Sequence, residues 1–191
     1  MLFLVRENSK KVHIGLTGHR PHKLWGYDLD QPEYDNLQDK LESIIETLLD
    51  GYGEVVCHSG LALGADTVWS IAILNMREKY PNRVKFYAEI PFMGQSGSWF
   101  GDSVDFWEYQ VENADFRSIY LDPLPGLTWE QVPKYRITKA LDDRNKGMVD
   151  KVDILIAISD GSKSGTKNAI DYAKKHCKYL LTYHPNDFKT R

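Results

Sequence analysis

Three short segments of the 191-residue chain are rich in glycine and small hydroxyl residues, and each follows an apolar stretch. They are Thr17 to Pro21 (TGHRP), Ser59 to Asp66 (SGLALGAD) and Gly161 to Lys167 (GSKSGTK). Small side chains leave the backbone N–H groups of such turns open, and N–H groups at the start of a helix bind phosphate and other anions. The segments therefore predict an anion or nucleotide site, to which Arg20 and Arg144 would add positive charge.

Each of these segments also has a plainer interpretation. The segment Ser59 to Asp66 fits a simple tight turn in which Asp66 caps the next helix by accepting a hydrogen bond from the amide of Val68 or Trp69. In a nucleotide site, Asp66 would instead hold a ribose hydroxyl. The segment at Gly161 lacks the Gly-Lys-Ser/Thr ending of a Walker loop, so the sequence does not predict ATP hydrolysis.

Acid–base and metal chemistry have weaker signals. Asp142 and Asp143 stand beside Arg144, where an ion pair or a solvated surface explains them better than a catalytic carboxylate pair. His19 and His22 have a spacing that suits a metal, but no Cys or carboxylate completes a recognisable ligand set. We therefore expect no metal site.

Stretches with strand character alternate with stretches at helical spacing along the whole chain. The expected strands cover residues 11–17, 55–57, 84–90, 117–121, 153–159 and 179–183, and the expected helices cover residues 32–49, 66–80, 103–114, 134–151 and 168–177. This alternation predicts an α/β, doubly wound, mostly parallel sheet of five to six strands. In such a sheet the loops that follow the strands share the carboxyl edge, where ligands bind.

Composition is that of an ordinary globular protein, with 42% hydrophobic and 27% charged residues. We expect one domain over residues 1–191, with its core at about 11–183. The formal net charge of −3 argues against nucleic acid as a partner, because proteins that bind its phosphates are usually basic. Met1 to Val5 is too short for a signal peptide and no run of residues spans a membrane, so a cytoplasmic protein is expected. Cys57 and Cys177 are expected to be buried free thiols.

Five segments, in order along the chain, resemble the SLOG superfamily of Rossmann-like proteins, which are related to the DNA-processing protein DprA and to the LOG phosphoribohydrolases. Within it the chain resembles the YpsA-like branch, formerly the domain of unknown function DUF1273. The segments are TGHRP at Thr17–Pro21, SGLALGAD at Ser59–Asp66, PFMGQSGSW at Pro91–Trp99, DRNKGMVDKVD at Asp143–Asp153 and DGSKSGTKNAIDYA at Asp160–Ala173.

The resemblance implies a Rossmann-like three-layer sandwich with a pocket for a nucleotide or a nucleotide derivative. A bound nucleotide or phosphate is the only cofactor that it implies, and homo-oligomerisation is a further expectation. In the pocket, Trp99 would stack on a base, or it would simply plug the core. The implied ligand-binding residues are Gly18, His19, Arg20, Ser59, Gly60, Gly64, Asp66, Gln95, Trp99, Arg144, Asn145, Gly161, Ser164, Gly165 and Thr166.

The chain departs from the LOG enzymes at one position. Those enzymes carry a GTxxE signature whose Glu supports cleavage of the N-glycosidic bond of a nucleoside monophosphate, and here Ala169 takes that place. Glycosidic transition states with oxocarbenium character need a placed carboxylate, for which Asp66 and Asp160 are the weak candidates. The leading hypothesis is therefore a binding protein for an ADP-ribose-like or NAD-like ligand. The alternatives are a LOG-like nucleotide N-glycosidase and a DprA-like binder of single-stranded DNA.

Overall fold

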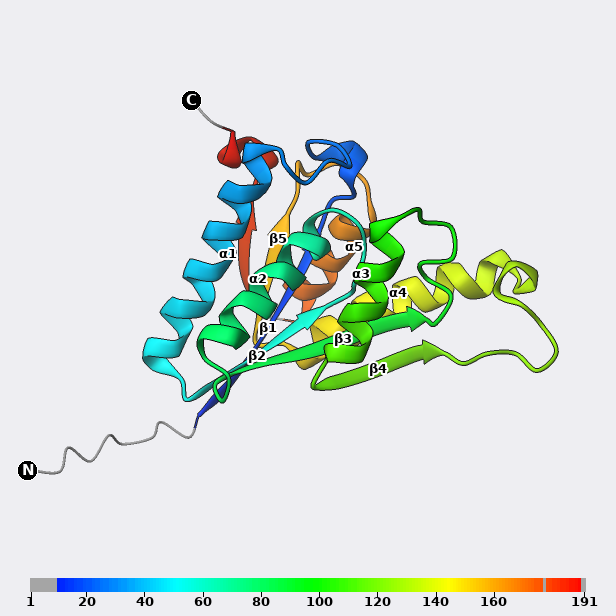
Figure 1. Ribbon diagram of the computed structural model, residues 1–191, viewed down its shortest axis with the longest axis horizontal. Helices are drawn as coiled ribbons and strands as arrows, with labels where there is room; N and C mark the ends of the chain where they lie inside the picture. Colours follow the sequence, from blue (N-terminus) through cyan, green and yellow to red (C-terminus); the bar gives the residue numbers. More distant parts are fainter. Residues whose placement is uncertain (1–9, 177, 190–191) are drawn as a thin grey trace, which may run out of the picture.

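The computed structural model describes residues 10–176 and 178–189, which contain a sheet of six parallel strands in the order β4-β3-β2-β1-β5-β6 (Figure 1). The strands are β1 Lys11–Gly18, β2 Glu54–Ser59, β3 Val84–Phe92, β4 Phe116–Leu121, β5 Ile154–Ile158 and β6 Tyr179–Tyr183. The α-helices are α1 Pro32–Gly51, α2 Ala65–Lys79, α3 Asp102–Asn113, α4 Lys134–Lys151 and α5 Gly165–Lys175. Short 3-10 turns are formed by Pro21–Lys23, Trp129–Gln131 and Pro185–Phe188.

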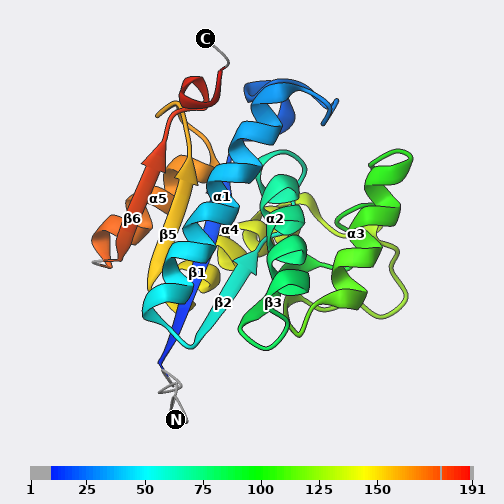
Figure 2. The same ribbon diagram turned by 60° about the vertical axis from the view of Figure 1, so that its left-hand side comes forward.

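Helices cover both faces of the sheet. Helices α1, α2 and α3 lie on one face, and α4 and α5 lie on the other (Figures 1 and 2). The central strands are accordingly apolar on both faces, as shown by the fully buried Ile14 in β1 and Leu155 in β5. The fold is the doubly wound α/β, Rossmann-like sandwich that the alternation of elements predicts.

The strand order reverses between β1 and β5. Strands β2, β3 and β4 follow one another outward on one side of β1, and α4 then returns the chain to place β5 on the other side. The register pairs Gly18, at the end of β1, with Ile158, at the end of β5. The loops that follow these two strands therefore leave the carboxyl edge next to each other and run to opposite faces, which opens a crevice.

Helix α5 begins earlier than the sequence suggests. Its first residue is Gly165, one turn before the expected start at Asn168. The reason is a side-chain cap, because the Oγ of Ser164 accepts a hydrogen bond from the amide of Lys167 at 3.2 Å. The first amides of α5 therefore lie at the carboxyl edge of the sheet, beside the crevice.

The expectation that Asp66 caps α2 is wrong. The helix is capped at Gly64, whose carbonyl accepts from the amide of Val68 at 3.3 Å, and Asp66 already lies in the first turn. The carboxylate of Asp66 turns back instead to the amide of Ala62, which lies 3.4 Å from Oδ2. Asp66 is therefore not the N-cap residue of α2 that the simple-turn interpretation required.

Cys57 is a buried free thiol in β2, as expected, and burial raises its pKa. Cys177, predicted to be a buried thiol, and Met1 to Val5, predicted to be too short for a signal peptide, lie outside the described residues. Within residues 10–176 and 178–189, no helix is both long enough and apolar enough to cross a bilayer.

Candidate functional site

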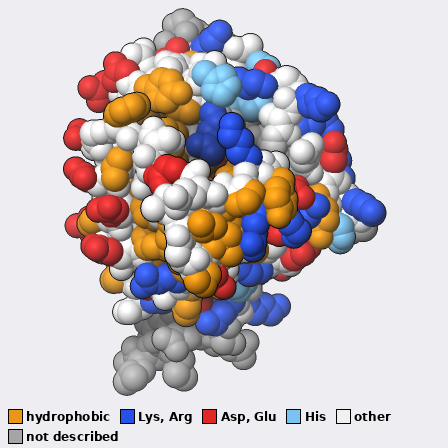
Figure 3. All heavy atoms as spheres, turned by 90° about the vertical axis from the view of Figure 1, so that its right-hand side faces the viewer, with side chains coloured by type: hydrophobic (Ala, Val, Ile, Leu, Met, Phe, Trp, Pro, Cys, Tyr) orange, Lys and Arg blue, Asp and Glu red, His pale blue; other side chains and the backbone are white. Residues whose placement is uncertain are grey.

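A cavity of about 210 Å³ lies at the carboxyl edge, between the loops that follow β1 and β5. Figure 3 views the molecule from the right-hand side of Figure 1, the side to which the arrows of β3 and β4 point. It shows Lys, Arg and His side chains around a hollow in the surface. The cavity is lined by Thr17, Gly18, His19, Arg20, His22, Lys23, Ala62, Asp66, Leu141, Arg144, Asn145, Ser164, Gly165 and Thr166. Segments that are far apart in the sequence thus meet at the reversal of strand order.

Close packing of the β1 loop against the start of α2 shapes one wall of the cavity. A Cβ atom at Gly18 would lie 2.2 Å from the Cβ of Ala65, and one at Gly64 would lie 2.6 Å from the carbonyl oxygen of His19. Gly64 also has a φ of +97°, a conformation that favours glycine. The amide of Ala65 donates to the same His19 carbonyl at 3.2 Å. These glycines therefore let the two loops approach each other and place Arg20 beside Asp66.

Arg144 is the central cation of the site. It projects from α4 and is only 6% exposed. Its Nη1 lies 3.5 Å from Oδ2 of Asp66, which is longer than a strong charge-assisted hydrogen bond, and its Nε has no hydrogen-bond partner among the described residues. Gly60 makes room for the guanidinium, because a Cβ at that position would lie 1.3 Å from Nη1. The protein thus buries a five-donor group and leaves at least one of its donors unsatisfied among the described residues.

The charges that line the cavity are unbalanced. Arg20, Lys23 and Arg144 are cations, and among the described lining residues Asp66 is the acid that faces them. Burial raises the pKa of Asp66, and the positive charges of Arg144 and Arg20 oppose that effect. Burial lowers the pKa of Arg20, with Asp66 opposing, but a guanidinium keeps its proton in a protein. An anion in the cavity would relieve this excess of positive charge.

His19 and Asp160 join the two loops that flank the crevice. The Nε2 of His19 lies 2.6 Å from Oδ1 of Asp160, and His19 is 2% exposed. The amide of Ser162 donates to the same carboxylate oxygen at 2.9 Å. Hydrogen bonds from Ser162, and then from His19, lower the pKa of Asp160. Asp160 is therefore an ionised carboxylate already used in joining the loops, and it does not line the cavity.

The start of α5 supplies neutral donors. Ser164, Gly165 and Thr166 all line the cavity, and the first amides of a helix have no acceptor within the helix. Asn145 of α4 lies opposite, with its Nδ2 3.7 Å from where a Cβ of Gly165 would be. Backbone amides, a hydroxyl group and an amide side chain are groups that bind phosphate oxygens.

Several residues that the resemblance assigns to the pocket do not line the cavity. Nine of the fifteen line the cavity, from Gly18 to Thr166, and the other six do not. The six are Ser59, Gly60, Gly64, Gln95, Trp99 and Gly161. Trp99 packs, partly buried, against the main hydrophobic core, which matches the plug interpretation rather than a base-stacking position in this cavity.

Gln95 supports the turn that follows β2. Its Nε2 donates to the carbonyl oxygens of Gly60 and Leu61, at 3.1 and 3.3 Å. Leu61 has a φ of +54°, which is uncommon for a residue with a side chain, and its amide donates to Ser59 Oγ at 3.3 Å. Gln95 and Ser59 thus hold a strained turn that leaves the space occupied by Arg144. Gln95 and Ser59 therefore influence the site by fixing the backbone of Gly60 and Leu61.

Two lining residues, Lys23 and Leu141, were not singled out from the sequence. Lys23 donates from Nζ to Ser162 Oγ at 2.8 Å, which adds another contact between the loops. Lys23 lies two residues after the TGHRP segment, so its position in the sequence was the available signal. His22, which lies between them, was considered from the sequence only as a metal ligand. Leu141 lies one helical turn before Arg144 on α4, and helical spacing places it on the same face.

A second polar cluster lies under α4 and was also missed. His13 Nδ1 lies 2.9 Å from His58 Nε2, and His58 Nδ1 lies 2.8 Å from Glu89 Oε1. Lys151 and Tyr120 donate to Oε2 of Glu89, each at 2.8 Å. Burial disfavours the charge of Glu89, but the hydrogen bonds from His58 and Lys151 outweigh it and lower the pKa of Glu89. The cluster joins four strands, β1 to β4, to α4.

The family model described as the YspA SLOG family, named YpsA, matches residues 14–184. The chain belongs to the YpsA SLOG family. It is 29% identical over 158 residues to the uncharacterized SPbeta prophage-derived protein YoqJ of Bacillus subtilis, a match that covers 77% of this chain and 85% of YoqJ. It is 24% identical over 171 residues to a UPF0398 protein of Bacillus anthracis, covering 90% of this chain and 86% of the relative.

The fold is also similar to that of DNA processing protein A from Helicobacter pylori, a protein described as binding single-stranded DNA. The TM-score is 0.54 at 15% sequence identity, and the match covers 90% of this chain. The chain spans 64% of the length of that DNA processing protein. This likeness supports the Rossmann-like fold of the SLOG proteins.

Proposed function

We propose that the protein binds a phosphate-bearing nucleotide or nucleotide derivative, such as an ADP-ribose-like or NAD-like molecule, in the cavity between β1 and β5. The observation that supports this proposal most strongly is that the buried guanidinium of Arg144 lacks a full set of hydrogen-bond partners in the part of the chain that the structure describes. The guanidinium is buried, contacts a single carboxylate at 3.5 Å and keeps an unpartnered Nε among the described residues. A phosphate accepts paired hydrogen bonds from such a group.

The proposed position of the phosphate is between Arg144 and the start of α5. There Ser164, Gly165 and Thr166 would donate to its oxygens, and Arg20 would add a second positive charge. The cavity volume of about 210 Å³ is below the roughly 300 Å³ at which drug-sized ligand pockets begin. The enclosed space would therefore hold a phosphate with its sugar, and the remainder of a larger nucleotide would lie across the rim.

Binding without glycosidic cleavage fits the residues better than the LOG-like alternative. Ala169, at the position of the LOG glutamate, is 3% exposed and packs in the apolar cluster that contains Met148 of α4. Asp160 is engaged with His19 and Ser162. Asp66 faces the cavity, but its carboxylate lies beside Arg144 and Arg20. None of the three positions presents an unengaged carboxylate to a glycosidic bond.

Thermal unfolding in the presence of ligands tests the proposal. AMP, ADP, ADP-ribose, NAD and inorganic phosphate should each be added to the wild-type protein and to Arg144→Gln. A ligand at 100 times its Kd stabilises the folded state by about 2.7 kcal/mol, and Arg144→Gln should lose that stabilisation. Lys139→Gln, at an exposed position of the same helix, is the matched control and should keep it. Absence of a shift with every nucleotide would contradict the proposal.

Single-stranded DNA is a second candidate ligand, because the cations around the cavity would also attract a phosphodiester backbone. DNA binding would weaken steeply as salt rises, and binding of a mononucleotide by a few groups would weaken far less. Retention of a labelled oligonucleotide at low salt, lost in Arg144→Gln and not competed by AMP, would favour DNA. Failure to bind at low salt would remove it.

A further inference from the structure

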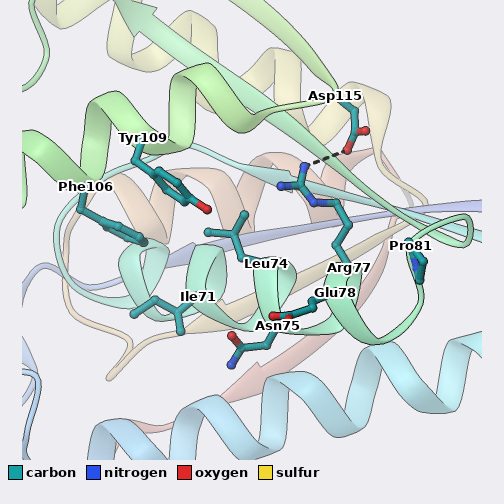
Figure 4. Close-up of a pocket in the computed structure, with 9 residues that line it drawn as sticks. All are labelled: Ile71, Leu74, Asn75, Arg77, Glu78, Pro81, Phe106, Tyr109 and Asp115. Carbon is teal, nitrogen blue, oxygen red and sulfur yellow. Dashed lines mark hydrogen bonds and ion pairs between the residues drawn. The ribbon is translucent and has the colours of Figure 1, made fainter.

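A groove of about 600 Å³ runs between α2 and α3, on the opposite face of the sheet from α4 (Figure 4). Ile71 and Leu74 of α2 form one apolar wall, and Phe106 and Tyr109 of α3 form the other. In Figure 4 the two rings point toward α2, and they stack with centroids 6.4 Å apart. Tyr109 remains 50% exposed. The groove therefore presents apolar surface to solvent.

One end of the groove is closed by an ion pair. The Nη1 of Arg77 lies 3.3 Å from Oδ2 of Asp115, as the dashed line in Figure 4 marks, and donates to the carbonyl oxygen of Asn113 at 2.5 Å. Asp115 also accepts from the amide of Phe86 at 2.8 Å. These contacts tie α2 to the end of α3 and neutralise the one cation that lines the groove in the part of the chain that the structure describes.

The rim of the groove is acidic. Glu78 of α2 lines it, and Asp105 and Glu112 of α3 lie four residues before and three residues after Tyr109, which makes them neighbours of that ring on the helix surface. All three are exposed. Among residues 10–176 and 178–189 none of them forms an ion pair, and α3 contains no Lys or Arg. The negative charge of the rim is therefore uncompensated.

We propose that this groove binds a basic amphipathic helix of a partner protein. A groove between two helices offers no strand edge, so the recognition mode is a helix whose apolar stripe fills the groove. The stretch of α2 that lines the groove, from Ile71 to Glu78, is about 10 Å long at 1.5 Å per residue, which suits about two helical turns. Apolar residues of the partner pack on Leu74 and Phe106, and its Lys or Arg side chains pair with Glu78 and Asp105.

A second copy of this chain fits the groove less well. Its basic helix α5 carries Lys174 and Lys175 in the last turn, but the apolar face of that helix is already buried through Ala169 and Ala173. Helix α5 would therefore have to separate from the core of its own molecule before it could enter the groove of another. The charge and shape of the site favour a separate partner.

Fluorescence anisotropy with a designed peptide tests the proposal. The probe is a labelled peptide of about 14 residues, roughly four turns, with Leu on one face and Lys on the other. A peptide of the same composition, with its Leu residues dispersed, is the control probe. At about 0.15 M salt the amphipathic peptide should bind and the dispersed one should not. The double variant E78K/D105K should weaken binding by about tenfold or more, and Leu74→Asp should weaken it likewise.

The matched control for charge is D35K/D39K, which reverses two exposed acids of α1 outside the groove and should leave peptide binding unchanged. Circular dichroism verifies that each variant is folded. Equal binding of the two peptides, or equal losses in the two double variants, would overturn the proposal, since either result would mean nonspecific attraction to an acidic protein. Concentration-dependent self-association that E78K/D105K abolishes would also overturn it, in favour of a second copy.

Discussion

Replacing Asp66 by asparagine should strengthen the binding of anions in the cavity between β1 and β5. Oδ2 of Asp66 lies 3.5 Å from Nη1 of Arg144, so the carboxylate competes with any phosphate for that guanidinium. A phosphate on the far side of Arg144 would lie about 6 to 8 Å from the carboxylate, and at an effective dielectric constant of about 20 two unit charges at that distance repel by about 2 to 3 kcal/mol. The Kd for the anion should fall by roughly 30- to 100-fold.

Inorganic pyrophosphate is the appropriate probe, because it has no ribose that Asp66 could bind. Calorimetric titration at neutral pH should show the tighter binding in Asp66→Asn. Since burial raises the pKa of Asp66, lowering the pH toward that pKa should protonate the carboxylate and strengthen binding to the wild type. The Asn variant should lose this pH dependence. Asp142→Asn, which removes a half-exposed acid paired with Lys146 on α4, is the control.

The unliganded Asp66→Asn variant should unfold more easily than the wild type, because Arg144 and Arg20 lose their shared counter-charge. Its fold should therefore be verified by circular dichroism before titration. If a folded Asp66→Asn binds pyrophosphate more weakly than the wild type, or equally well, the reasoning about charge in the cavity is wrong.

Three further outcomes follow from the packing. Gly60→Ala should displace the Arg144 guanidinium, because the new methyl group would lie 1.3 Å from Nη1. The anion affinity measured by calorimetry should fall at least about tenfold, which corresponds to the loss of one charge-assisted contact. An unchanged affinity would contradict the assigned position of Arg144. Glu89→Gln should lower the free energy of unfolding in urea by about 3 kcal/mol, because the charge of Lys151 loses its buried partner, whereas a change below about 0.5 kcal/mol would mean that the cluster is not stabilising. Burial lowers the pKa of His58 in the folded protein, with Glu89 opposing, so as the pH falls His58 is protonated in the unfolded chain before it is protonated in the folded protein. The free energy of unfolding should therefore be constant above about pH 6.5 and fall below it by up to about 1.4 kcal/mol per pH unit. His58→Gln should flatten that fall.

The parts of the site that could be predicted from the sequence are those that parallel-sheet topology places without further information. Gly18 ends β1, Arg20 and Ser164 lie in loops that follow strands, and the carboxyl ends of parallel strands share one edge. Arg144 lies within a helix, α4, and was added as a nearby cation and by the family resemblance; it lines the cavity. Their role in binding a ligand remains a prediction.

The parts that could not be predicted depend on which strands are neighbours. His58 and Glu89 stand in adjacent strands, β2 and β3, so their contact follows from a register that neither segment encodes by itself. Gln95 looks like a loop residue with a ligand-binding amide, but the position of the β2 turn makes it a support for Gly60 and Leu61. The early start of α5 was missed because Ser164 can cap the helix only when its backbone is extended there.

Calorimetric titration of ADP-ribose into the wild-type protein and into Arg144→Gln tests the central claim most directly. The wild type should bind one ADP-ribose molecule per cavity, and the variant should bind at least about 30-fold more weakly, which corresponds to about 2 kcal/mol for a charged hydrogen-bond partner. Equal affinity in the two proteins would contradict the assignment of Arg144 as the group that holds the phosphate.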